Sequence, residues 1–266
     1  MYKIAVDAHT HTVISGHAYC TYGELWAEAA EAGLCGFGVA DHISRTIARV
    51  NGGEVEKITV VSDFNISGRD AIPRVKNGVK LYHGVEIDIV KKDGSLFGHD
   101  VKTGFFDYSG ALPDIFLSRL DYAIAGVHLM DEYPLTKSEG TAMYVNAMAH
   151  PKVFILGHIH QGDIPFDIGE VAKAARDMGK AIEINEAKLK HEHEASRAKA
   201  LAVRCAELGT MIAVNSDAHS FGKIGVFPKA LAMLEEIGFP PELIVNGDTE
   251  RFEKAINLAQ ALRGGD

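Results

Sequence analysis

The sequence IAVDAHTH, residues 4–11, joins a short apolar run to two histidines spaced two apart. Alternate side chains of a β-strand point to the same side, so His9 and His11 can converge on one metal ion. Histidine is the commonest metal ligand in proteins. For an isolated pair of this kind, two surface histidines at the end of a strand are an equally good interpretation. The rest of the chain decides between the two.

Further apolar runs follow this stretch, and amphipathic helical segments separate them. The runs cover residues 36–40, 79–89, 121–127, 153–156, 181–184 and 211–214. Together with residues 4–8 they form about seven units in which a strand precedes a helix. This alternation predicts an α/β fold with a parallel sheet, either open or closed into a barrel.

Capping residues mark where several helices begin and end. The sequence TYGE at residues 21–24 is a capping box and predicts a helix that ends at Gly33. The sequence DIGE at residues 167–170 predicts a second helix, and two more are expected over residues 193–208 and 249–262.

One interval lacks such signals. Residues 47–77 are rich in glycine, asparagine and charge, which predicts a long loop with one short helix. No internal repeat or linker is evident, so we expect a single domain over residues 1–266.

The composition excludes several classes of protein. Of 266 residues, 47% are hydrophobic and 24% charged, which is typical of a soluble globular protein. The net charge of -9 argues against binding nucleic acid through a basic surface. Cys20, Cys35 and Cys205 lack C-x-x-C spacing, so we expect a reducing compartment, the cytoplasm, and no thiolate zinc site. The early acid Asp7 predicts a first strand instead of a signal peptide or membrane span.

Metal-type residues recur at or near the ends of the other predicted strands. In parallel α/β folds these ends gather at one rim, where active sites are built. The residues are His42, Glu86, His128, His158, Asp217 and His219, and His17 in the loop after the first strand can reach the same rim. Any one of them, taken alone, is more often a hydrogen-bonded core residue, but their joint placement predicts a metal site.

The remaining histidines have weaker claims to a metal. Structural or solvent-exposed roles are expected for His83, His99, His150, His191 and His193. The last two lie in the charged run of residues 188–194, which predicts a solvated face. His160 shares a face with His158, and ligation, substrate contact and simple hydrogen bonding all stay open for it.

The predicted ligands offer only nitrogen and oxygen, and they are too many for one tetrahedral ion. They suit two or three ions with a bridging carboxylate, and zinc, manganese and iron all fit such a set. Water bound to these ions ionises near neutral pH and can attack a phosphate ester without a protein nucleophile. No G-x-S-x-G, P-loop or G-x-G-x-x-G motif is present, which argues against serine hydrolases, kinases and dinucleotide oxidoreductases.

These motifs resemble the polymerase and histidinol phosphatase (PHP) family, and within it the YcdX-type metal-dependent phosphatases most closely. The resemblance covers nearly the whole chain. The matching segments are residues 7–12 with His17, then 40–42, 72–75, 84–87, 124–128, 155–158, 182–185 and 215–219. The resemblance implies a distorted TIM-like barrel of seven strands and helices, (βα)7, and about three divalent ions, with zinc ahead of manganese and iron.

The resemblance also implies how the ligands divide among the ions. His9, His11, Glu86 and Asp217 would hold one ion, Glu86, His128 and His158 a second, and His17, His42 and His219 a third, with Glu86 as the bridge. One position departs from the family pattern: similar proteins have proline and glycine after the fifth-strand histidine, whereas here Ile159 and His160 follow. His158 is therefore expected to be the ligand and His160 a substrate contact.

The function predicted from these residues is a metal-dependent phosphoesterase that hydrolyses a small phosphate monoester by metal-activated water at a trinuclear site. A PHP-type nuclease or exonuclease is one alternative, disfavoured because no basic groove is evident. A metal-binding regulatory protein without turnover is the other. We expect a cytoplasmic protein with a small phosphorylated substrate and no nucleic-acid or membrane partner, and the oligomeric state stays open.

Overall fold

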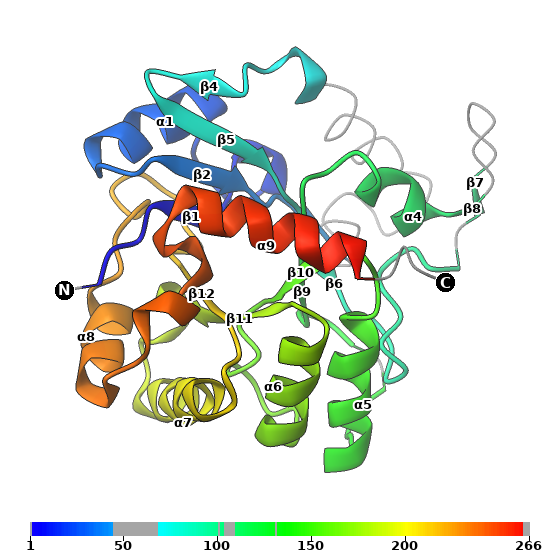
Figure 1. The fold of residues 1–266 in the computed structure, drawn as a ribbon. Coiled ribbons are helices and arrows are strands. Elements are labelled where there is room, and N and C mark those ends of the chain that lie inside the picture. Colours follow the sequence, from blue (N-terminus) through cyan, green and yellow to red (C-terminus); the bar gives the residue numbers. More distant parts are fainter. Residues whose placement is uncertain (1, 45–68, 101, 104–109, 131, 263–266) are drawn as a thin grey trace.

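The computed structural model describes residues 2–44, 69–100, 102–103, 110–130 and 132–262. It is a mixed α/β fold in which parallel strands lie between helices (Figure 1). Most of the predicted loop over residues 47–77 falls outside the described residues. The part that is described forms a short 3-10 helix, Arg69–Ala71, and the strand β4, Val75–Lys76.

The strands form two main sheets. The first has the order β1 (Val6–Thr10), β2 (Gly36–Val39), β5 (Val79–His83) and β4, with only β4 antiparallel. The second has the order β12 (Ile212–Asn215), β11 (Ala181–Asn185), β10 (Val153–Leu156), β9 (Ala123–Gly126), β6 (Glu86–Asp88) and β3 (His42–Ile43), all parallel. A separate antiparallel pair joins β7 (Lys102–Thr103) to β8 (Gly110–Ala111).

The predicted strand over residues 79–89 divides into β5 and β6 at Gly84. A Cβ at Gly84 would lie 2.7 Å from the ring of Tyr122, so only glycine lets the chain pass this buried tyrosine. The two sheets also approach each other at their first and last strands. Thr10, in β1, forms a parallel bridge with Ala218, just after β12. Nearby, the backbone N–H of Ser216 donates to Asp7 at 3.1 Å.

The α-helices of the described residues are α1 (Tyr22–Glu31), α4 (Leu112–Leu117), α5 (Lys137–Ala147), α6 (Ile168–Asp177), α7 (Glu192–Leu208), α8 (Pro228–Ile237) and α9 (Thr249–Ala261). The capping box at Thr21 is confirmed, because its hydroxyl accepts from Glu24 N–H and Glu24 accepts from Thr21 N–H. Asp167 caps α6 as predicted. The helices predicted from the sequence do not include α4, α5 and α8 with their bounds. None of the helices within the described ranges is both long and apolar enough to cross a membrane.

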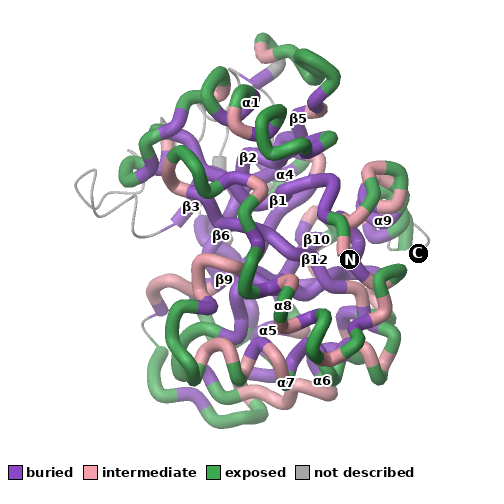
Figure 2. Tube along the Cα trace, turned by 90° about the vertical axis from the view of Figure 1, so that its left-hand side faces the viewer, coloured by how far each residue is buried: buried purple, intermediate pink, exposed green. Residues whose placement is uncertain are grey.

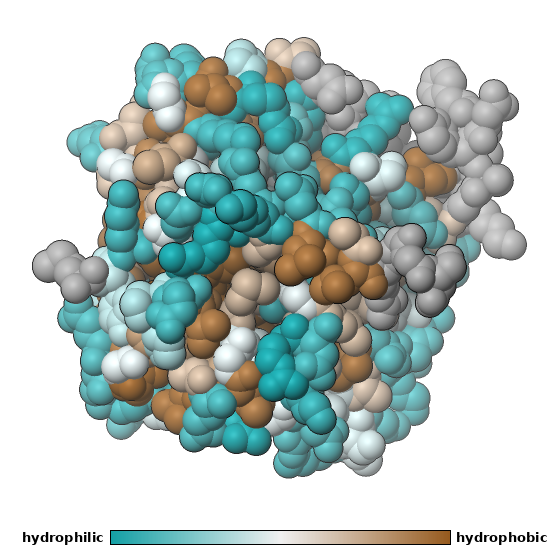
Figure 3. Space-filling model, in the orientation of Figure 1, coloured by the Kyte–Doolittle hydropathy of each residue, from teal (hydrophilic) through white to brown (hydrophobic). Residues whose placement is uncertain are grey.

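The strands are almost entirely buried, whereas the outer faces of the helices are exposed (Figure 2). On the face shown in Figure 3, hydrophilic residues dominate, and a group of hydrophobic residues lies near the C-terminal part of α9. Leu258 and Leu262 are each 54% exposed there. Polar residues are also buried, and many of them lie at the C-terminal ends of the strands. His9, Asp41, Glu86 and Asp88 are at most 1% exposed.

Candidate metal centre

The structure brings all nine predicted ligands to one end of the parallel strands. His9 belongs to β1, His42 to β3 and Glu86 to β6. The others lie in the segments that follow a strand: His11 and His17 after β1, His128 after β9, His158 after β10, and Asp217 and His219 after β12. The placement follows from parallel topology, because the carboxyl ends of parallel strands share one edge.

Glu86 lies at the middle of this group and is 1% exposed. Its Oε1 accepts a hydrogen bond from His158 Nε2 at 2.7 Å and lies 3.4 Å from His128 Nε2. Its Oε2 lies 2.8 Å from His42 Nδ1 and 3.2 Å from His9 Nε2. One carboxylate therefore faces ligand-type atoms on both of its oxygens, as a bridging ligand does.

Asp217 is the second acid of the group. Its Oδ1 lies 3.2 Å from His11 Nε2 and 3.6 Å from His9 Nε2. The backbone of Asp217 is left-handed, with φ of 55°, and the backbone of His158 is left-handed as well, with φ of 33°. Neither residue is glycine, and such strained positions concentrate at functional sites.

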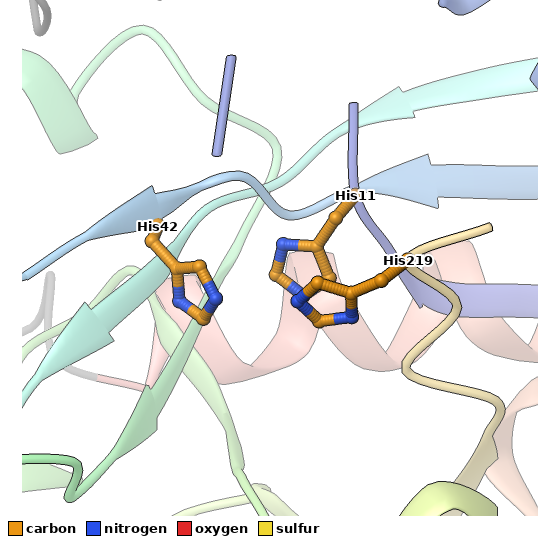
Figure 4. Close-up of side chains that lie close together, drawn as sticks. All are labelled: His11, His42 and His219. Carbon is orange, nitrogen blue, oxygen red and sulfur yellow. The ribbon is translucent and has the colours of Figure 1, made fainter. Parts of the chain in front are cut away.

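A group of histidines lies beside the two acids. Figure 4 shows the rings of His11, His42 and His219 turned toward one another from three separate segments. The His11 ring centroid lies 4.4 Å from that of His42 and 4.1 Å from that of His219. His17 is exposed, and its ring lies 4.9 Å from His42 and 4.6 Å from His219.

Carboxylates behind the site orient three of the histidines. His9 Nδ1 donates to Glu183 at 2.7 Å, and His128 Nδ1 donates to Asp88 at 2.6 Å. Each bond leaves Nε2 as the nitrogen that faces the site. Histidine ligands of metals show this arrangement, in which the second nitrogen donates to a carboxylate or carbonyl.

His11 is held in the same way, through an intermediate hydroxyl. Its Nδ1 donates to the Ser15 hydroxyl at 3.0 Å, which in turn donates to Asp41 at 2.7 Å. Two further histidines donate from Nδ1 to backbone carbonyls: His17 to Ser15 at 2.9 Å and His219 to Asp217 at 3.0 Å.

The donor atoms themselves show whether the residues fit a metal. Several are buried and form no hydrogen bond with a described residue, although some of them lie 2.8–3.6 Å from one another: Nε2 of His9, His11 and His219, Nδ1 of His42, Oε2 of Glu86 and Oδ1 of Asp217. Each unpartnered buried polar group costs about 1–3 kcal/mol. Ligands on one tetrahedral ion with bonds of about 2.1 Å lie about 3.4 Å apart, close to the separations given above. The residues fit divalent cations.

Within the part of the chain that the structure describes, three sets of residues place one donor atom each within 4.8 Å of one another: His9, His11 and Glu86; His42, Glu86 and His128; and His11, His42 and His219. The first set agrees with the division that the resemblance implies. In the other two, His42 takes part alongside His128 and His11, whereas the resemblance groups it with His17 and His219. Assignment of ligands to individual ions stays a prediction.

The charges of the site shift its pKa values in opposite directions. Burial disfavours a charged His9, yet Glu183 and Glu86 outweigh it and raise the pKa of His9 well above its usual value. Burial also disfavours an ionised Glu86, but His128 and His9 hold the pKa of Glu86 well below its usual value. At His11 burial, helped by the neighbouring imidazoles of His42 and His9, lowers the pKa well below its usual value. The site thus favours the ionised form of Glu86 and the protonated form of His9, and it disfavours the protonated form of His11.

The site opens into a cavity of about 130 Å³ lined by His17, His42, Ser44, His128, Lys188, Asp217 and His219. Among these lining residues Lys188 is the only lysine or arginine. Its side chain is 24% exposed, and its Nζ lies 3.1 Å from Asp217 Oδ2. The sequence analysis assigned residues 188–194 to a solvated face, which was wrong for Lys188 because the 3-10 helix Glu186–Lys188 turns it inward. His191 and His193 are exposed, as predicted.

The sequence analysis also missed three orienting acids. Asp41 and Asp88 are part of motifs that it used, and Asp88 shares a strand face with Glu86. Glu183 is the sole charged residue of the buried strand β11, and that contrast is a usable signal. His83, His99 and His150 take no part in the three ligand sets.

His160 lies close to the centre but outside the ligand sets. It is 1% exposed, and burial lowers the pKa of His160 to about 4, so its imidazole is neutral. Neither ring nitrogen has a hydrogen-bond partner in the described part of the chain.

Proteins of similar fold have been solved. The histidinol phosphate phosphatase of Lactococcus lactis, complexed with zinc, L-histidinol and phosphate, matches with a TM-score of 0.56 and 16% identity over 89% of this chain and 94% of that one. A chain of archaeal ribonuclease P with mature tRNA matches with a TM-score of 0.53 and 15% identity, over 98% of this chain and 94% of that chain. At these identities the likeness concerns the fold alone.

Curated proteins show a closer relationship, although no family model matches the chain. A protein of Acetivibrio thermocellus named "probable phosphatase" is 32% identical over 257 residues, 96% of this chain and 95% of the relative. A protein of Clostridium botulinum with the same description is 34% identical over 253 residues, 95% and 94% of the two chains. Because identity above 30% extends over nearly the full length of both partners, the chain belongs to this family of probable phosphatases.

Proposed function

We propose that this protein is a metal-dependent phosphatase, a hydrolase of phosphoric ester bonds that acts on a small phosphate monoester. The observation that carries the proposal is the set of unpartnered, buried donor atoms around Glu86 and Asp217. The family of probable phosphatases supports the activity. The similar fold that holds zinc and phosphate in the Lactococcus lactis enzyme supports the metal.

The proposal includes a finer description of the fold, a distorted (βα)7 barrel of the PHP type forming one domain over residues 1–266. The strand pairings support it, because they form a series of seven neighbours if β2 and β3 count as one member and β5 and β6 as another. The series runs β1, β2/β3, β5/β6, β9, β10, β11 and β12. The bridge between Thr10 and Ala218 links the first and last members of this series.

Each residue of the site has a role in this proposal. Bound divalent ions, about three and zinc ahead of manganese or iron, supply an activated water nucleophile and neutralise the charge of the phosphoryl group. His9, His11, His17, His42, Glu86, His128, His158, Asp217 and His219 hold the ions. Glu183, Asp88 and Asp41 keep the imidazoles in the tautomer that presents a lone pair to the site. No protein side chain serves as the nucleophile.

Lys188 binds a non-bridging oxygen of the phosphoryl group. Its ammonium group lines the cavity beside Asp217, and its positive charge attracts the dianion of a phosphate ester. The proposal places the enzyme in the cytoplasm, with a small phosphorylated substrate and neither nucleic acid nor membrane as partner.

Two measurements test the proposal. Elemental analysis of the purified protein should find divalent metal, and chelated protein should release phosphate from 4-nitrophenyl phosphate only after zinc, manganese or iron(II) is restored. Asp217→Asn should lose metal and activity together, whereas His193→Asn, at an exposed position, should match the wild type. Absence of turnover with all three metals at full occupancy overturns the proposal. A nuclease assay on single-stranded DNA separates the phosphatase from a nuclease.

A further inference from the structure

A second cavity, of about 140 Å³, lies beside the candidate metal centre, between the segment that follows β10 and helix α7. Its polar lining residues are His160 and Arg197, and its apolar lining includes Ile164, Phe166, Ile168 and Leu201. His160 follows the predicted ligand His158 by two residues, so their Cα atoms are at most about 7 Å apart. The cavity therefore adjoins the segment that carries the predicted ligand His158.

His160 reaches this cavity with both ring nitrogens unpartnered within the described ranges, although it is only 1% exposed. A buried imidazole without partners destabilises a fold unless something binds it. The His160 imidazole offers one donor and one acceptor to an occupant of the cavity.

Arg197, on α7, gives the cavity a positive charge. Its Nη1 donates to the carbonyl of Gly162. No ion pair found among the described residues involves Arg197, and the guanidinium group has five N–H donors. The guanidinium group therefore has further N–H donors beside the unpartnered imidazole. Together the two groups can bind a carboxylate, which accepts hydrogen bonds on both oxygens.

The wall opposite α7 is held firmly. Gly140 of α5 lies so close to the loop that a Cβ there would be 2.0 Å from the carbonyl oxygen of Pro165. The backbone N–H of Asp167 donates to Thr141 Oγ1 at 2.8 Å. The rings of Tyr144 and Phe166 meet edge to face, with centroids 5.1 Å apart. A cavity with such a wall is formed in advance, which reduces the entropic cost of binding.

We propose that this cavity binds the alcohol part of the substrate, and that this part is a small ring or branched chain bearing a carboxylate. The carboxylate pairs with Arg197 and hydrogen-bonds to His160, while the carbon frame contacts Phe166 and Leu201. The size is suitable, because an engineered apolar cavity of about 150 Å³ holds a benzene molecule. The inference rests on the proposed phosphatase function, for which it names the substrate class.

Two esters of equal size test the preference. We expect kcat/KM for 4-carboxyphenyl phosphate to exceed that for 4-carbamoylphenyl phosphate at least tenfold. The net charge of -9 alone would favour the opposite order, because it repels the additional negative charge of the carboxylate. Arg197→Gln should abolish the preference. Arg204→Gln, which removes an exposed arginine of the same helix, should keep it. Equal kcat/KM for the two esters in the wild type, or an unchanged preference in Arg197→Gln, overturns the proposal.

Binding of the dephosphorylated alcohols gives a readout without catalysis. In calorimetric titrations 4-hydroxybenzoate should bind the wild type at least tenfold more tightly than it binds Arg197→Gln, and 4-hydroxybenzamide should bind both weakly. If no ester is hydrolysed but 4-hydroxybenzoate binds in this Arg197-dependent way, the phosphatase function fails and the cavity assignment stands. If esters are hydrolysed but the carboxylate has no effect on binding, the cavity assignment fails alone.

His160→Leu separates a binding role from a structural one. Removing two unpartnered nitrogens should raise the Tm of the protein, while 4-hydroxybenzoate should bind more weakly. A lower Tm with unchanged binding would show that His160 supports the fold and takes no part in recognition.

Discussion

Lys188 Nζ lies 3.1 Å from Oδ2 of Asp217, while Oδ1 of the same carboxylate faces His11 Nε2 at 3.2 Å. One carboxylate therefore touches a predicted metal-ligand imidazole with one oxygen and a fixed ammonium group with the other. The contact keeps Lys188 at the edge of the metal centre without using the oxygen that faces the ligands. It also prevents the long lysine side chain from sampling solvent, so little further entropy is lost when it binds an anion.

Replacing Lys188 by methionine should weaken the binding of phosphate more than it slows the chemical step. We expect KM for 4-nitrophenyl phosphate and the inhibition constant of inorganic phosphate to rise about tenfold, because a charge-assisted contact to a phosphoryl oxygen contributes about 1.5–3 kcal/mol. Lys173→Met removes an exposed lysine of α6 and is the matched control. Steady-state kinetics check this, and an unchanged KM would exclude the assigned contact.

Glu183→Gln should lower metal affinity although Glu183 is outside the predicted ligand set. One oxygen of Glu183 accepts from His9 Nδ1 and the other from the backbone N–H of His158, whereas a glutamine amide accepts on one side only and carries no charge, so the His9 imidazole is held less firmly. Loss of such an outer contact typically costs 10- to 100-fold in metal affinity or activity. Competition with a chromophoric chelator measures the change. Glu207→Gln, at an exposed ion pair on α7, should retain wild-type affinity.

The pH dependence of stability should change sign when metal binds. Burial disfavours a charged His128, but Glu86 and Asp88 prevail and raise the pKa of His128 to about 9. In the unfolded chain the value is about 6.5. The metal-free protein is therefore stabilised by protonated His128 below about pH 6.5, and it loses this contribution as the pH rises through 9.

Metal binding requires the neutral imidazole, so the zinc-loaded protein should instead gain stability as the pH rises. Thermal denaturation across pH 6 to 9, with chelator and with zinc, checks both slopes. Parallel slopes in the two conditions would rule out His128 as a ligand.

Gly38→Ala should destabilise the fold through a clash far from solvent. The added Cβ would lie 1.8 Å from the hydroxyl of Tyr122, which donates to the carbonyl of Ala8. Overpacking of a well-filled core costs about 1–3 kcal/mol or more. Urea denaturation should show this loss. Adding Tyr122→Phe should restore part of it, and strictly additive losses would contradict the proposed contact.

Much of the centre could be predicted because it follows from strand topology. Apolar runs identify the strands, and the ends of parallel strands share an edge, so His9, Glu86 and Asp217 meet despite their separation in sequence. The orienting contacts could not be predicted in this way. They depend on side-chain direction, as with Glu183 behind His9, or on a local turn, as with Lys188.

Two of the helices whose bounds were not predicted, α5 and α8, escaped prediction for different reasons. Helix α5 carries Gly140 in its interior and places glycine and threonine among its buried residues, so its pattern lacks an apolar face. That glycine is there because α5 touches the loop at Pro165, a tertiary contact that no local pattern records. Helix α8 does have local signals, Pro228 at its first position and Gly238 at its end. These two residues predict the start and the end of α8 from the sequence alone.

Asn246 lies in the buried seam between β1 and β12, where its side-chain amide donates to the carbonyls of Val6 and Val214. This seam joins residues more than 200 positions apart, and His9 and Asp217 face each other beside it. During synthesis the ribosome must therefore release most of the chain before the two ends can meet. Until then His9 and His11 have Glu86 beside them but lack Asp217 and His219, so completion of the metal centre is expected to be among the last events of maturation.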